Sequence, residues 1–111
     1  MFKSKCLIKL EQIPDGDSTG LIAKIKGQNT ALIAVRQGES VFLYVNTCPH
    51  IGAPLDFEPG RFLNLGKDLI QCALHGALFT IDTGNCVDGP CKGKHLTSVP
   101  CVIKKGGVYL S

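Results

Sequence analysis

Two short segments carry the residues best able to do chemistry. Each pairs a cysteine with a histidine, as Cys-x-His at residues 48–50 and as Cys-x-x-His at residues 72–75, with residues 51–71 between them. Together they offer two thiolates and two imidazoles, a set that suits either a tetrahedral zinc ion or an iron–sulfur centre. Ligand type alone therefore leaves both centres open. The four candidate ligands are Cys48, His50, Cys72 and His75.

The order of these ligands favours iron and sulfide over zinc. Zinc fingers usually place two cysteines close together and then two histidines close together. Here each segment has a cysteine followed by a histidine, so each could give one ligand to each of two irons. Gly52 and Gly76 follow the histidines and would let backbone N–H groups approach sulfur closely. Apolar residues that could form a low-dielectric shell are Pro54, Leu55, Leu74, Leu78 and Phe79.

The elements that position these segments are predicted to be short strands. The chain has 111 residues, the size of one domain, and its 44% hydrophobic content is enough for a core. Thirteen glycines and six prolines are typical of many turns, and no segment shows a sustained helical period. The sequence therefore predicts an all-β domain. We expect strands at Cys6–Leu10, Leu21–Ile25, Ala31–Val35, Val41–Val45, Leu63–Leu65, Leu69–Gln71, Ala77–Ile81, Cys86–Val87, Cys101–Ile103 and Val108–Leu110.

Both segments begin where a predicted strand ends, so loops from neighbouring hairpins could bring them together. At this point the pattern resembles a known family. The motifs Cys48-Pro49-His50 with Gly52, and Cys72-x-x-His75-Gly76, resemble the two ligand boxes of Rieske proteins. Further likeness to small bacterial Rieske ferredoxins covers nearly the whole chain, in residues 13–16, 46–48 and 88–91.

This resemblance implies one 2Fe-2S cluster, with Cys48 and Cys72 on one iron and His50 and His75 on the other. It also implies a Rieske-like antiparallel β-sandwich with a small cluster-binding subdomain made of two loops. We expect a single Rieske domain over residues 1–111, with a basal β part at about 1–45 and 92–111 and a cluster-binding part at about 46–91. The stretch between the boxes is longer than in typical Rieske ferredoxins, and residues 61–68 look like the extra length.

The resemblance further implies a low reduction potential. High-potential Rieske proteins have an extra cysteine in each box, joined as a disulfide, where this chain has Ala53 and Leu74. They also have a serine and a tyrosine hydroxyl that donate to sulfur, where this chain has Ala77 and Phe79. Hydrogen bonds to sulfur favour the reduced cluster. We expect a potential near the low end of the Rieske range, roughly −150 to +300 mV.

The remaining cysteines and histidine are expected to be structural. Cys86 and Cys91 flank the Gly89-Pro90 step, which resembles the proline-containing loop that covers the cluster in Rieske proteins, and we expect two small buried side chains. A disulfide or redox pair is the alternative there. Cys6 and Cys101 lie in predicted strands and are expected in the core. His95 is expected at the surface.

Composition excludes several other function classes. The net charge is only +3 and the lysines are scattered, which argues against nucleic-acid binding. No stretch has the apolar length of a membrane helix, and the N-terminal residues lack the apolar run of a signal peptide. We therefore expect a monomeric cytoplasmic protein with no membrane or nucleic-acid partner.

The sequence predicts an electron carrier and not a catalyst by itself, because no nucleophile–base pair or phosphate-binding loop appears. It would take single electrons from an NAD(P)H-dependent flavoprotein reductase and pass them to an oxygenase or a reductase. The alternative is a tightly bound Rieske-like small subunit of a larger oxidoreductase, such as an NAD(P)H nitrite reductase. A zinc-bound interaction module is the third interpretation.

Overall fold

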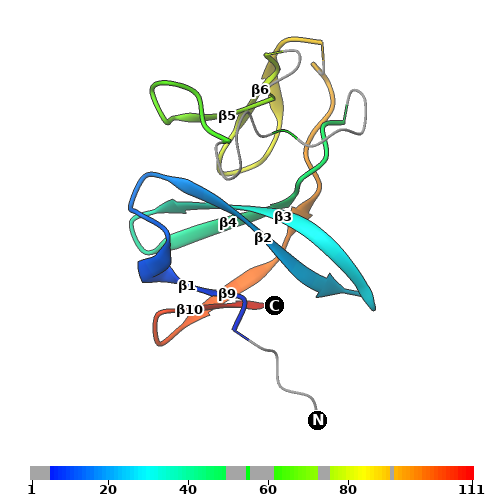
Figure 1. Cartoon of the computed structure of the whole chain (residues 1–111). Helices are drawn as coiled ribbons and strands as arrows, with labels where there is room; N and C mark the ends of the chain where they lie inside the picture. The colour runs from blue at the N-terminus through cyan, green and yellow to red at the C-terminus, as the bar shows by residue number, and fades with distance from the viewer. Residues whose placement is uncertain (1–5, 50–54, 56–61, 73–75, 91) are drawn as a thin grey trace.

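The computed structural model describes residues 6–49, 55, 62–72, 76–90 and 92–111, and in these ranges the chain forms strands and one short 3-10 helix (Figure 1). Every strand pairing is antiparallel, which confirms the all-β prediction. The elements are β1 (Ile8–Lys9), η1 (Leu10–Gln12), β2 (Ser18–Ile25), β3 (Gln28–Gln37), β4 (Ser40–Val45), β5 (Leu69–Gln71), β6 (Leu78–Thr80), β7 (Cys86–Asp88), β8 (Ser98–Val99), β9 (Cys101–Lys104) and β10 (Gly107–Leu110). No helix in the described ranges has the length and apolar character that crossing a bilayer requires.

Three small sheets lie one above another. Their strand orders are β1-β10-β9, β2-β3-β4-β8 and β5-β6-β7. In Figure 1 the four-stranded sheet occupies the middle, with β1, β9 and β10 below it and β5 and β6 above it. The middle sheet therefore has a neighbour on each face.

Strand β3 shows why this arrangement follows from the sequence. Successive side chains of a strand point to opposite faces of its sheet. Leu32 and Ala34 face the lower apolar cluster, whereas Ile33 and Val35 face the upper one. All four are completely buried, so the run 31–35 reads as continuously apolar because both faces of β3 are covered.

The buried residues form two apolar clusters. The basal core consists of Ile13, Ala23, Leu32, Ala34, Val41, Leu43 and Val108. The upper core consists of Ile33, Val35, Tyr44, Cys48, Leu55, Phe62, Ile70, Cys72, Ala77, Phe79, Ile81, Cys86 and Leu96. The upper core contains both cysteines of the ligand boxes, and the middle sheet separates it from the basal core.

The hairpin predicted around residues 37–40 is confirmed, since β3 and β4 pair from Leu32↔Val45 to Gln37↔Ser40. The strand predicted at Cys6–Leu10 is much shorter than expected. It contains only β1, because the Ile13 N–H donates to the Leu10 carbonyl at 3.0 Å and turns the chain into η1. The two-residue strand β8 was not predicted, since it carries too few residues to show any period.

The hairpin predicted over residues 63–71 is only half formed. Strand β5 is present, but Leu63 makes a single bridge to Ile70. Asn64 explains the difference, because its side-chain Oδ1 accepts the N–H groups of Asp68 and Leu69, both at 3.1 Å, and closes a turn. Lys67 on this turn also pairs with Asp17 of the basal part at 3.1 Å. That pair is exposed and adds little stability.

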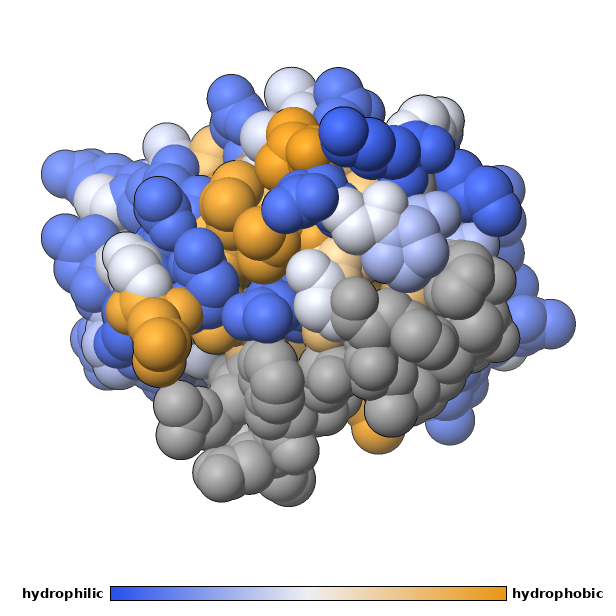
Figure 2. All heavy atoms as spheres, turned by 90° about the horizontal axis from the view of Figure 1, so that it is seen from above, coloured by the Kyte–Doolittle hydropathy of each residue, from blue (hydrophilic) through white to orange (hydrophobic). Residues whose placement is uncertain are grey.

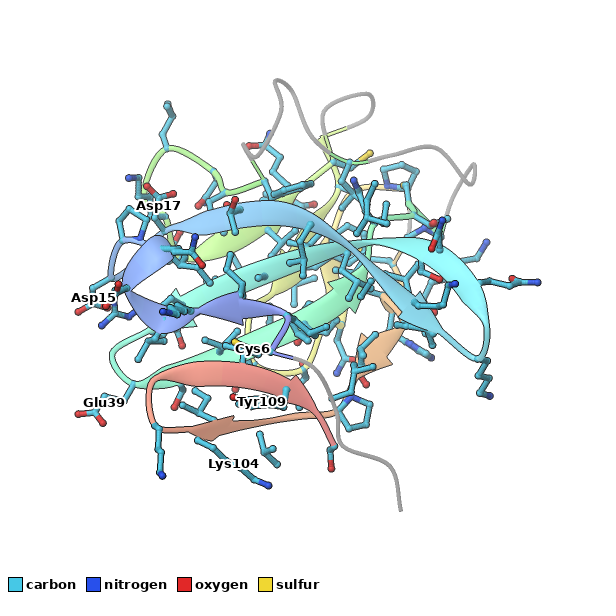
Figure 3. The ribbon with its side chains drawn as sticks, turned by 60° about the horizontal axis from the view of Figure 1, so that its bottom comes forward. Cys6, Asp15, Asp17, Glu39, Lys104 and Tyr109 are labelled. Carbon is cyan, nitrogen blue, oxygen red and sulfur yellow. The ribbon has the colours of Figure 1, made fainter. Side chains whose placement is uncertain are left out.

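The prediction that Cys6 lies in the core is wrong, because its side chain is exposed. It precedes β1 and lies with Tyr109 at the basal end of the molecule (Figure 3). Cys101 is partly buried, its thiol donates to the Val41 carbonyl at 3.4 Å, and burial raises its pKa. Cys86 is buried and His95 is exposed, both as predicted, whereas Cys91 lies outside the described residues.

Candidate metal centre

The first ligand box follows β4 and is tied to the middle sheet. The backbone N–H of Asn46 donates to the Ala31 carbonyl of β3 at 2.9 Å, and that of Val45 donates to Thr97 at 2.9 Å. Two residues later Cys48 is completely buried. The side chain of Asn46 also reaches across the box, where its Oδ1 accepts the Leu55 N–H at 2.8 Å. Cys48 therefore leaves the sheet at a well-anchored point.

The second ligand box lies at the end of the β5–β6 hairpin. The backbone N–H of Cys72 donates to the Ala77 carbonyl at 2.9 Å, and the Gly76 N–H donates back to the Cys72 carbonyl at 2.9 Å. Gly76 has a φ of +67°, a left-handed conformation that favours glycine. Cys72 and Ala77 are therefore held together by a backbone hydrogen bond, and both are completely buried.

The fold brings the two candidate thiols into one environment, although they come from different sheets. Cys48 follows β4 of the middle sheet and Cys72 follows β5 of the upper sheet. Both cysteines have no exposed surface, and both belong to the upper core. His50 and His75 lie outside the described residues. No group of three or more potential metal-ligating side chains occurs within the described ranges.

Burial in this core fits a metal centre that is bound through sulfur. A thiolate is costly in an apolar core unless a cation compensates its charge, and metals bind the thiolate form. The surroundings of the two thiols are apolar, including Leu55, Ala77 and Phe79, each completely buried. This is the low-dielectric shell that the sequence predicted for Leu55 and Phe79, whereas Pro54 and Leu74 lie outside the described residues and Leu78 is only partly buried.

A contact after β7 supports the second box and was not foreseen from the sequence. Gly89 lies so close to the box that a Cβ added to it would be 2.7 Å from the Ala77 Cα. Its φ is +93°, so the residue needs the conformational freedom of glycine as well as its small size. The loop that begins at Gly89 therefore packs directly against the backbone that closes the second box.

Tyr44 links the middle sheet to the upper sheet and was also missed. Its hydroxyl donates to the Ile81 carbonyl at 2.5 Å, and its ring packs against Gly84, where an added Cβ would lie 2.7 Å from Cε1. Burial, with a smaller contribution from the Asp82 carboxylate, raises the pKa of Tyr44 to about 12. The available signal was a tyrosine within an apolar strand, since a buried tyrosine hydroxyl normally has a hydrogen-bond partner.

This raised pKa predicts a stability change at high pH. An unfolded tyrosine ionises near pH 10, but folded Tyr44 keeps its proton to about pH 12. Its contribution to the free energy of unfolding is thus complete below pH 10 and is lost as pH rises toward 12. Tyr44→Phe should cost about 1 kcal/mol at neutral pH and should weaken this decline. Thermal melts at pH 7 to 11.5 measure both effects, and Tyr109→Phe, at the basal end, is the matched control. Equal alkaline declines in Tyr44→Phe and wild type would contradict the assignment.

The surface above the upper sheet is partly apolar. Figure 2 looks down on this end and shows hydrophobic side chains gathered among hydrophilic ones. Leu65, on the turn between the boxes, is 99% exposed, and Val87 of β7 is 46% exposed. The end of the molecule that carries β5 and β7 therefore has exposed apolar surface.

Comparison with known proteins identifies the type of domain. Residues 3–103 match the family model described as the Rieske [2Fe-2S] domain. Among curated proteins, the chain is similar to cholesterol 7-desaturase of Caenorhabditis elegans, with 34% identity over 92 residues. That match covers 78% of this chain and 21% of the relative, so the chain spans about a fifth of the length of the curated protein that it matches.

Solved structures show the same fold. The ferredoxin of carbazole 1,9a-dioxygenase from Nocardioides aromaticivorans IC177 is 23% identical, with a TM-score of 0.75, over 99% of this chain and 98% of the ferredoxin. A structure described as the complex of reduced oxygenase and oxidized ferredoxin in carbazole 1,9a-dioxygenase contains a chain that is 23% identical, with a TM-score of 0.72. The alignment covers 98% of this chain and 100% of that one.

Proposed function

Because this chain belongs to the Rieske [2Fe-2S] domain family, whose members bind a 2Fe-2S cluster and transfer electrons, we propose that Cys48 and Cys72 hold one iron and that His50 and His75 hold the other. The observation that supports this assignment most directly is the complete burial of both cysteines in the upper core. The bound cluster supplies a one-electron couple. The chain supplies the ligands and an apolar surrounding that limits access of water.

This ligand assignment is tested on the native protein. Protein purified without oxygen from iron-replete cells should be coloured, contain two irons and two acid-labile sulfides per chain, and give an EPR signal only after reduction. Colourless protein with one zinc and no sulfide would contradict it and would support the zinc-bound interpretation.

We further propose that residues 46–91 form the cluster-binding part and that residues 1–45 and 92–111 form the basal part. The upper sheet, from β5 to β7, lies entirely within 46–91, which supports this division. Two residues of the proposed cluster-binding part, Ala77 and Phe79, are completely buried and have no hydroxyl. This supports a potential near the low end of the Rieske range, because hydroxyl donors to sulfur stabilise the reduced cluster.

Adding hydroxyls at these positions tests the proposed low potential. The double variant Ala77→Ser, Phe79→Tyr should raise the midpoint potential, since each new hydroxyl would favour the negative charge added on reduction. Dye-mediated redox titration measures it. Phe62→Tyr is the control, because Phe62 is also buried in the upper core but is not an expected donor position. A wild-type midpoint above about +100 mV, or no upward shift in the double variant, would contradict the proposal.

As a carrier, the protein would take single electrons from an NAD(P)H-dependent flavoprotein reductase and pass them to a terminal oxygenase or reductase. The solved complex between a ferredoxin of this fold and its oxygenase supports this kind of partner. Docking would be transient, with an interface below about 1,200 Å². Rapid mixing of the reduced protein with candidate oxygenases tests the proposal, since a true acceptor should reoxidise it within catalytic turnover times.

A second arrangement is favoured by the match to a fifth of cholesterol 7-desaturase. The same domain could serve as a permanent part of a larger oxidoreductase, as in the nitrite reductase alternative. Size exclusion of native extracts separates the two arrangements, because a carrier should elute as a monomer and a permanent subunit should co-elute with its enzyme.

We also place the carrier in the cytoplasm, and the unpaired thiols of Cys6, Cys86 and Cys101 support a reducing compartment.

A further inference from the structure

The two ligand boxes are closed by different kinds of hydrogen bond. Among the described residues, the second box is closed by backbone hydrogen bonds, from the Cys72 N–H to the Ala77 carbonyl and from the Gly76 N–H to the Cys72 carbonyl. The first box is bridged by a side chain, since Asn46 Oδ1 accepts the Leu55 N–H at 2.8 Å. The Asn46–Leu55 hydrogen bond therefore joins the two ends of the sequence segment that includes Cys48 and His50.

Both ends of this hydrogen bond are firmly placed. The backbone N–H of Asn46 donates to the Ala31 carbonyl of β3 at 2.9 Å, which ties the residue to an inner strand of the middle sheet. Leu55 is completely buried in the upper core beside Cys48 and Cys72. A buried N–H group needs an acceptor, and losing one costs more than an ordinary hydrogen bond contributes.

We propose that Asn46 is a positioning residue for the 2Fe-2S cluster, because its Oδ1 closes the first ligand box and so holds Cys48 in place. This inference rests on the proposed ligand assignment. Removing the oxygen frees the Leu55 end of the first box while the backbone closure of the second box stays intact. In such a variant the ligands of the first box would be held less firmly than those of the second box.

The chain contains a matched control for a purely structural effect. Asn64 makes the same type of closure, since its Oδ1 accepts the N–H groups of Asp68 and Leu69, both at 3.1 Å. Its turn holds none of the proposed ligands, and like Asn46 it is partly buried. An effect that is general to losing an asparagine cap would appear equally at both positions.

The experiment compares cluster release in the holoprotein of wild type, Asn46→Ala, Asn46→Asp and Asn64→Ala. Release into excess chelator is followed by visible absorbance, and the reduced cluster is examined by EPR. Asn46→Ala should release the cluster about tenfold faster than wild type, as expected for an unsatisfied buried N–H, and should broaden the EPR signal. Asn46→Asp keeps an acceptor oxygen and should restore wild-type release. Asn64→Ala should match wild type in both measurements.

Equal release from Asn46→Ala and Asn64→Ala, or equally fast release from Asn46→Asp and Asn46→Ala, would overturn the inference. If Asn46→Ala does not accumulate, Asn46→Ser takes its place. It should release the cluster faster than both wild type and Asn64→Ala, and its EPR signal should differ from both. Failure of the ligand assignment looks different, because wild-type protein would then contain no 2Fe-2S cluster. If wild-type protein contains its cluster and substitution of Asn46 does not change cluster release, only the positioning role is overturned.

Discussion

Replacing Cys72 with serine should remove the 2Fe-2S cluster, whereas replacing Cys86 with serine should leave it bound. Both cysteines are buried in the upper core, so the two substitutions place a hydroxyl in similar apolar surroundings. Only Cys72 is a proposed ligand. The Cys86 thiol instead donates to the Asp88 carbonyl at 3.1 Å, and a serine hydroxyl can make the same bond.

The expected size of this effect is large because a ligand is lost outright. Changes that merely orient a ligand typically cost about 10- to 100-fold in metal affinity, and loss of the ligand itself should cost at least as much. Iron and acid-labile sulfide per chain, with the visible spectrum, measure the cluster content. Because metal binding stabilises the fold that creates the site, Cys72→Ser should also melt at a lower temperature. A full complement of iron and sulfide in Cys72→Ser, or loss of iron and sulfide in Cys86→Ser, would contradict the assignment of Cys72 as a cluster ligand.

Gly89→Ala should strongly destabilise the protein, although Gly89 is not a proposed ligand. The residue has a φ of +93°, and an added Cβ would lie 2.7 Å from the backbone Cα of Ala77, which cannot rotate away as a side-chain end could. Strain at a positive φ costs about 1–2 kcal/mol, and forcing the contact apart should add about 1–3 kcal/mol. Displacing Ala77 also disturbs the carbonyl that accepts the Cys72 N–H.

Gly93→Ala is the matched control for this prediction. Gly93 has a φ of +90°, nearly the same as that of Gly89, but a Cβ there would meet no heavy atom within 4 Å. It should therefore lose only the strain term and keep its cluster. Urea unfolding and the rate of cluster release into chelator measure the two variants. Similar losses in both would show that the contact with Ala77 is unimportant.

Local patterns in the sequence were enough to predict the ligand boxes and the β class. The two Cys–His segments are recognisable because their ligands are close in sequence, within residues 48–50 and 72–75. The hairpin of β3 and β4 was predictable for the same reason, since a short turn joins two apolar runs. Cys6 shows where such patterns fail, because an alternating segment does not say whether anything covers it, and the strand found there begins only at Ile8.

Tertiary structure alone decided which residues support the boxes. Tyr44 reaches Ile81 across 37 residues, Asn46 meets Leu55 across a box, and Gly89 packs on Ala77. The Tyr44–Ile81 pair depends on how the middle and upper sheets stack. The Gly89–Ala77 contact depends on the register of β6 with β7, and the Asn46–Leu55 hydrogen bond depends on how one loop closes. None of the three follows from a local residue pattern. The sequence thus predicted the chemistry that the proposed ligands would offer, since ligand type and order are local properties. The stacking of the sheets decided the setting of that chemistry, since burial and long-range hydrogen bonds exist only once distant strands have packed together.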